Sequence, residues 1–137
     1  MARQILYRNH CTPQEQVSSG GRYYLDSDCG RKLTGSYLLE LDEDKVLYNT
    51  ITGNAETIDV LDPGDGGAGT AGDSDFLYVK AIKIYSGTVK ISLDNGSTTP
   101  IELYEGEAFA SKINASASVQ PKIVVSGLAT VEYLVAT

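Results

Sequence analysis

The most regular hydrophobic pattern lies in residues 76–137, where apolar and polar residues alternate with the period of two that is typical of β-strands. Residues 76–85 have apolar side chains at both odd and even positions, as a strand buried on both faces would. Residues 89–93 follow with one apolar face, and the Asp-Asn-Gly-Ser sequence at 94–97 favours a tight hairpin because asparagine and glycine tolerate positive φ angles. Further strands are expected at 101–104, 107–113, 122–125 and 130–136.

These strands follow one another along the chain with short turns between them, so we predict an antiparallel meander. Its apolar face is expected to be the surface on which the earlier part of the chain packs. The inward-facing residues of its strands define the predicted core. That core consists of Val89, Ile91, Leu93, Ile101, Leu103, Phe109, Ile123, Val125, Val131 and Tyr133.

The front half of the chain contains shorter β-like runs, at residues 22–25, 36–41, 45–51 and 57–61. The acidic turn at 42–44 predicts a hairpin over residues 36–51, and a further turn is expected at 52–54. Residues 62–75 are rich in aspartate and glycine and are predicted to form an exposed contact loop. No amphipathic helix is evident. We therefore predict an all-β fold, an antiparallel β-sandwich with the jelly roll as one candidate topology.

Residues 1–21 lack the regular alternation and are predicted to be an extended N-terminal arm, followed by a single domain over residues 22–137. The apolar run at 5–7 has the right length to add a short strand to an exposed sheet edge of a neighbouring subunit. Basic residues of the arm would then meet acidic surface. The predicted intersubunit contacts are Arg3, Ile5, Leu6, Tyr7, Arg8 and His10. The alternative is an arm that folds back over an edge of its own sheet.

The charge of the protein argues against several classes of partner. Among 137 residues, 11 are basic and 18 are acidic, which gives a formal net charge of −7. Scattered cations in an acidic chain do not form the basic stripe that a nucleic acid or an anionic membrane requires, so neither partner is expected. No apolar run is long enough to span a membrane, and the N-terminus lacks the apolar core of a signal peptide. We therefore expect synthesis in a cytoplasm.

The sequence contains no constellation that predicts catalysis or a bound cofactor. His10 and Cys11 are adjacent, whereas a nucleophile and its base must face one another across a site. Cys11 and Cys29 are expected to be reduced thiols, with a bridge between them as the alternative. The aspartates of residues 62–75 are the kind of oxygen ligand that calcium takes, but their spacing matches no calcium-binding motif, and a solvated loop is expected. We predict a protein that is not an enzyme.

Three segments carry a resemblance to known proteins: Gly-Thr-Val-Lys-Ile-Ser-Leu-Asp-Asn-Gly at 87–96, Pro-Ile-Glu-Leu-Tyr-Glu-Gly-Glu-Ala-Phe at 100–109 and Thr-Val-Glu-Tyr-Leu-Val-Ala at 130–136. Together they resemble small structural proteins from the virions of tailed bacteriophages. The resemblance covers residues 76–137 and implies a capsid decoration or cement protein, or a head or tail accessory protein. It also implies a homo-oligomer whose partners are the major capsid protein or neighbouring copies in a virion made in the host cytoplasm. The alternative is a β-sandwich module on a tail or fibre that binds a receptor or a carbohydrate.

Overall fold

A computed structural model describes residues 3–11, 14–16, 23–25, 33–65, 67–95, 101–116 and 118–137. Within these ranges the protein is built from antiparallel β-strands and one short 3-10 turn, with no α-helix, which confirms the predicted all-β class. The chain divides into two compact units. The body comprises Met1–Ile5 and Leu39–Thr137, and the arm unit comprises Leu6–Leu38.

The body contains eight of the described strands. Six of them form one antiparallel sheet, and the other two, β6 and β7, form a small hairpin around the 3-10 turn η2 (Pro63–Asp65). The strands are β5 (Val46–Asp59), β6 (Leu61–Asp62), β7 (Gly69–Thr70), β8 (Phe76–Ile84), β9 (Val89–Ser92), β10 (Ile101–Leu103), β11 (Ala108–Lys112) and β12 (Lys122–Ala136).

Strand β12 is the centre of the large sheet, since it pairs along its length with β5 on one side and with β8 and then β9 on the other. Ala136 lies opposite Phe76 in β8, and Val125 lies opposite Val89 in β9. Strands β8 and β9 therefore follow one another along the same edge of β12 and do not pair together. Strand β11 pairs with β8, and β10 pairs with β9. The predicted meander of neighbouring strands is thus wrong, because the closing strand enters the middle of the sheet.

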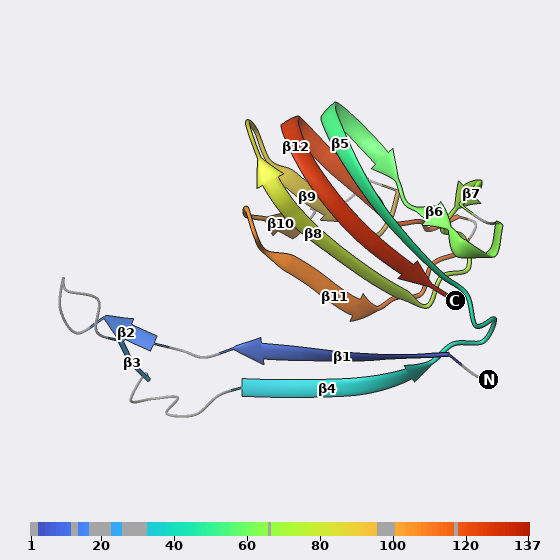
Figure 1. The fold of residues 1–137 in the computed structure, drawn as a ribbon, viewed down its shortest axis with the longest axis horizontal. Helices are drawn as coiled ribbons and strands as arrows, with labels where there is room; N and C mark the ends of the chain where they lie inside the picture. The colour runs from blue at the N-terminus through green and yellow to red at the C-terminus, as the bar shows by residue number, and fades with distance from the viewer. Residues whose placement is uncertain are drawn as a thin grey trace. The chain divides into compact units, whose positions relative to one another are not determined.

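The sheet bends sharply about halfway along its strands. Positive φ angles occur at Ala55 in β5 (48°) and at Gly87 between β8 and β9 (73°), and the β5–β12 register shifts between Val125 and Leu128. The backbone N–H groups of Tyr85 and Ser86 both donate to the Leu128 carbonyl, at 2.8 and 3.1 Å. Bulges and glycines are the usual means of turning a sheet through a corner. The bend brings the two halves of the sheet around a common interior, in a nearly closed, barrel-like arrangement (Figure 1).

The core lies inside this folded sheet. Most of the predicted core residues are buried there, and Phe109 packs against the cluster while partly exposed. The confirmed members are Val89, Ile91, Leu103, Ile123, Val125, Val131 and Tyr133. Leu93 and Ile101 were predicted wrongly, since they are 39% and 43% exposed. Both residues lie next to the connection between β9 and β10. There the apolar alternation of the sequence continues beyond the part of the sheet that is covered by the opposite half of the sheet.

Two predictions in the front half are also wrong, and a third is only partly right. Residues 36–51 do not form a hairpin, because β5 pairs with β12, and β4 (Leu33–Glu40) pairs with β1 (Gln4–Cys11). The turn expected at 52–54 is instead part of the continuous strand β5. The aspartate-rich segment is not simply an exposed loop: it contains the β6–β7 hairpin, and Ala71 and Ser74 are buried.

The remaining described strands form two small antiparallel sheets. Strands β1 and β4 make a two-stranded sheet, here called the ribbon, and β2 (Gln14–Gln16) pairs with β3 (Tyr23–Leu25). The sequence predicted an extended arm over residues 1–21 with one short strand at 5–7, whereas the structure has both β1 and β2 within that range.

Candidate functional site

The register of the ribbon follows from three contacts between β1 and β4 and the residues beside them. The N–H of Leu41 donates to the Arg3 carbonyl at 3.1 Å, and Gln4 Nε2 donates to Glu40 Oε1 at 3.3 Å. The rings of Tyr7 and Tyr37 lie 6.1 Å apart, centre to centre, at an angle of 53°. Each contact joins a residue to the one directly opposite it in a single antiparallel register, which also places Leu6 opposite Leu38.

This register separates the residues of the ribbon onto two faces, because successive side chains in a strand point to opposite sides. Leu6 and Leu38 lie on one face, with Arg8 and His10 following at intervals of two residues. Tyr7 and Tyr37 lie on the other. Of the predicted contact residues, the structure therefore brings Leu6, Arg8 and His10 together and places Ile5 and Tyr7 on the opposite face.

The ribbon exposes large apolar side chains: Leu6 is 56% exposed, and Tyr37 and Leu38 are each 51% exposed. A two-stranded sheet is marginally stable alone in water and normally needs a third strand or a packed layer on one face. None of the side chains described at residues 6–11 and 34–38 is buried. The ribbon is thus a candidate surface for contact with another molecule.

A shallow pocket of about 460 Å³ lies at the end of the ribbon that residues 8–10 and 34–36 form. It is lined by Arg8, Asn9, His10, Thr34, Gly35 and Ser36, which come from both strands. Its lining is polar and basic, in contrast to the neighbouring leucine pair. The leucine face of the ribbon therefore combines an apolar patch with Arg8 beyond Leu6 and Glu40 beyond Leu38, so its two formal charges balance.

Formal charge is divided unequally between the two units. Residues 6–38 carry four basic and three acidic residues, a net charge of +1. Residues 1–5 and 39–137 carry seven basic and fifteen acidic residues, a net charge of −8. The acidic character of the whole protein thus belongs to the body, which favours cationic partners at its surface.

Arg3 belongs to the body and anchors the start of β1. Its N–H donates to Asp44 Oδ1 at 2.7 Å, and its carbonyl accepts the N–H of Leu41. The contact of Arg3 with a neighbouring subunit stays a prediction, as it does for the other five residues. Because β1 already pairs with β4 of its own chain, the strand addition that we expected can use only the remaining edge of β1.

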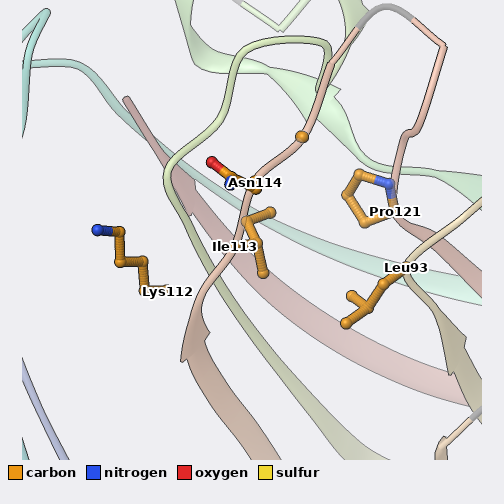
Figure 2. Close-up of a pocket in the computed structure, with 6 residues that line it drawn as sticks. Leu93, Lys112, Ile113, Asn114 and Pro121 are labelled. Atoms are coloured by element: carbon orange, nitrogen blue, oxygen red, sulfur yellow. The ribbon is translucent and has the colours of Figure 1, made fainter.

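The body carries a second pocket, of about 270 Å³, where β9 and β11 end. Its walls are mostly apolar, from Leu93, Ile113, Ala115 and Pro121, with Lys112 and Asn114 beside them. In Figure 2 the Lys112 side chain points away from the space between Ile113, Leu93 and Pro121. The pocket was not expected from the sequence, because Leu93 was predicted to lie in the core and because residues 113–121 lack regular alternation.

Acidic groups lie close to the body pocket. The Ile113 N–H donates to the Asp75 carbonyl at 2.9 Å, and Asp94 directly follows Leu93. Burial, and then the negative charge of Asp42, raises the pKa of the Asp75 carboxyl, while Lys112 acts in the opposite direction. Glu43 and Asp73 raise the pKa further. This end of the body therefore has an excess of negative charge.

A cluster of two tyrosines and a glutamate occupies the outer face of the large sheet. Tyr48 and Tyr78 donate their hydroxyls to the two carboxylate oxygens of Glu132, the latter at 2.7 Å. The hydrogen bond from Tyr48, and after it the one from Tyr78, holds the pKa of the Glu132 carboxyl below its ordinary range. Burial and the bond to Glu132 raise the pKa of Tyr78 to about 12. Both oxygens of Glu132 are already bonded, so the cluster ties three strands together.

The described ranges show little that supports chemistry. Within them, His, Cys, Asp and Glu side chains nowhere form groups of three or more that could hold a metal ion. Asp62 Oδ1 instead accepts the N–H of Gly64 at 2.7 Å and stabilises the β6–β7 turn. Cys11 is an exposed free thiol, whereas Cys29 lies outside the described residues. No helix in the described part of the chain has the length and hydrophobicity needed to cross a membrane.

Comparisons with known proteins add no family or function to this geometry. No protein-family model, no curated protein and no solved structure matches the chain.

Proposed function

We propose that this chain is a non-enzymatic structural protein of a tailed-phage virion, a capsid decoration or cement protein that stabilises the particle through contacts between subunits. The single observation that carries an assembly role is the ribbon, a two-stranded sheet that presents Leu6, Tyr37 and Leu38 to solvent. The phage context rests on the resemblance of residues 76–137 to small virion proteins.

Two further features favour assembly. Exposed apolar side chains on one unit and excess negative charge on the other suit association between copies, since apolar burial supplies affinity and charge guides encounter. The partners in this proposal are neighbouring copies or the major capsid protein, in a virion assembled in the host cytoplasm.

The second candidate function is a binding module on a tail or fibre, for a receptor or a carbohydrate. The observation that favours it is the outer face of the sheet, where Tyr48 is 56% exposed beside Thr50 and Glu132. Aromatic and hydrogen-bonding side chains together suit recognition of a polar ligand. Copy number in purified particles separates the two: hundreds of copies in register with the capsid support decoration, and a few at the tail support the binding module.

Deletion of residues 1–12 tests the assembly role. The deletion removes β1, so the exposed leucine pair is lost while the folded sheet of the body keeps its strands. We expect a folded protein with a nearly unchanged melting temperature that no longer assembles, measured by calorimetry and by light scattering coupled to gel filtration. A shortened protein that unfolds, or that assembles like the full chain, would contradict this role for the arm.

A further inference from the structure

We propose that two copies of this chain pair through their β5 strands, with residues 46–53 of one copy antiparallel to the same residues of the other. The two large sheets then form one continuous sheet across a two-fold axis. This inference rests on the proposed assembly role and names a contact between copies that is additional to the ribbon. An interface between one surface and its own copy closes at a dimer.

Strand β5 has a free backbone edge, since among the described residues it pairs only with β12 (Figure 1). Lys45 and Thr137 exchange both of their backbone hydrogen bonds, at 3.1 and 3.0 Å. Bonded and non-bonded pairs alternate along an antiparallel ladder, so the odd-numbered residues of 46–53 bond to β12 and the backbone groups of the even-numbered ones point to the free side. The Thr50 N–H accordingly donates to the side-chain oxygen of Asn49, at 2.9 Å.

This edge lacks the features that usually keep a free strand from pairing with another molecule, which are charged side chains, proline, a bulge or a short length. The other free edges of the large sheet have such features: β10 has three residues and contains Glu102, and β11 has five residues and ends in Lys112. Residues 46–54 contain no charge and no proline, and the first positive φ angle of β5 comes after them, at Ala55. The edge of β5 is therefore the long unprotected edge of this sheet within the described ranges.

The same strand from a second copy matches this edge on both faces of the sheet. A two-fold axis perpendicular to the sheet keeps inner side chains on the inner face and outer side chains on the outer face. On the inner face, Leu47 and Ile51 pack against the core but are only partly buried, and their counterparts would cover them. On the outer face, Thr50 and Thr52 would meet hydroxyl side chains, as Thr52 already meets Thr130 of β12 at 3.0 Å.

A second copy is favoured over the other strands that could occupy the edge. The net charge of −7 opposes the approach of two copies, so a contact between them belongs where charge is absent. Residues 46–54 meet this condition, and the charged residues at 43–45 and at 56 lie outside them. The free edges of a ribbon are the competing occupants, but they would bring Arg8 on β1 or Glu40 on β4 into the pair. Every copy carries the unprotected edge of β5, so pairing of β5 with β5 needs no further component.

Variants of opposite charge test which strand occupies the edge. The lysine variant is Thr50→Lys with Thr52→Lys, the glutamate variant is Thr50→Glu with Thr52→Glu, and the neutral control is Thr50→Gln with Thr52→Gln. All of them change exposed side chains and leave the backbone bonds to β12 in place. Like charges on paired strands oppose pairing, so each charged variant should associate about tenfold to one hundredfold more weakly than the wild type.

Light scattering coupled to gel filtration reads out the pairing. The neutral control should keep the molar mass of the wild type, and each charged variant should have half that mass. An equimolar mixture of the lysine and glutamate variants should restore the full mass, because opposite charges then face one another. A mixture without this rescue would overturn the proposal, since rescue is specific to pairing of β5 with β5. Charged variants that keep the full mass, or a wild type that is monomeric, would also overturn it.

Folding of the variants is checked by circular dichroism and thermal melting. Glu132 lies opposite Thr50 in β12, so the glutamate variant should melt at a lower temperature than the lysine variant. If the glutamate variant does not fold, Thr52→Glu alone takes its place, because Thr52 lies opposite the uncharged Thr130.

Hydrogen exchange of the full chain tests the same edge without any substitution. The amides of Val46, Tyr48 and Thr52 should exchange about tenfold or more slowly in concentrated than in dilute protein, whereas those of Leu47 and Ile51, which bond to β12, should be protected in both. Rapid exchange of the first three amides at every concentration would contradict the pairing. The virion role is judged separately, by copy number in particles and by deletion of residues 1–12, which keeps β5 and should remove only assembly beyond this dimer.

Discussion

The body and the ribbon are both built from antiparallel β-strands, yet they bury their apolar side chains to opposite extents. In β12, alternate residues such as Val131, Tyr133 and Val135 are completely buried inside the folded sheet. In the ribbon, apolar and polar residues share each face, and Leu6 and Leu38 are more than half exposed. A regular apolar alternation therefore accompanies the core of the folded sheet, whereas the mixed faces of the ribbon have no buried side chain among those described at residues 6–11 and 34–38.

The difference lies in what each strand has beside it. The sheet of the body bends at Ala55, at Gly87 and at the irregularity after Val125. Because of this bend, each half of the sheet serves as the second layer for the other half. The ribbon has two strands, and none of its side chains described at residues 6–11 and 34–38 is buried. The buried apolar side chains that stabilise the protein are thus concentrated in the body.

Truncating one leucine in each region should give the largest difference between the two regions in the free energy of unfolding. Leu77→Ala removes a fully buried side chain from the core and should lower the free energy of unfolding by about 2–5 kcal/mol. Leu6→Ala, at 56% exposure, should change it by less than about 0.5 kcal/mol. Urea unfolding at low protein concentration measures both. Similar losses in the two variants would show that the ribbon's leucines are already buried within the isolated protein.

Substituting one glycine in each region should give a smaller contrast. A Cβ on Gly127, in the bend, would collide with the Ser86 carbonyl group, so Gly127→Ala should cost about 1–3 kcal/mol as the corner shifts. A Cβ on Gly35, in the ribbon, meets nothing within 4 Å, and Gly35→Ala should be neutral or stabilise by up to about 1 kcal/mol. Thermal unfolding followed by circular dichroism compares them. An unperturbed Gly127→Ala variant would mean that the bend tolerates a side chain.

The tyrosine–glutamate cluster predicts the smallest effect, on the pH dependence of the body. The pKa of Tyr78 is about 12 in the folded protein and 10 ordinarily, so its contribution to stability is complete below pH 10 and is lost as the pH rises towards 12. Glu132 has a lowered pKa, so its contribution is present above its ordinary value of 4.5 and is lost as the pH falls through the folded value.

Ultraviolet titration of the tyrosines tests this assignment. Tyr78→Phe should remove the phase near pH 12, and Glu132→Gln should move that phase towards pH 10 because the carboxylate no longer accepts the hydroxyl proton. Tyr104→Phe, at an exposed position of the body, is the control and should leave the phase near pH 12 unchanged. A titration in which Tyr78→Phe leaves that phase intact would refute the assignment.

The candidate surface was only half visible in the sequence. The apolar run at residues 5–7, with its basic neighbours, led us to predict a contact strand there, because apolar side chains are not favoured on a solvated loop. Its partner Leu38 was assigned to a hairpin with β5, since adjacency in sequence is the default expectation for pairing. The body pocket could not be predicted, because Leu93 and Pro121 meet only after β9 and β12 pair.

The sequence by itself determined the strands and most of the core, because the alternation at residues such as Ile91, Ile123 and Tyr133 reflects the local geometry of an extended chain. It predicted the pairing of β9 with β10, but not the pairings of β5 and β12. Any strand with an apolar face can hydrogen-bond to another, and the choice depends on distant packing and on the corner formed by Gly87 and Gly127. Only the tertiary structure decided that β12 lies between β5 and the β8–β9 edge, and that Leu6 lies opposite Leu38 in the ribbon.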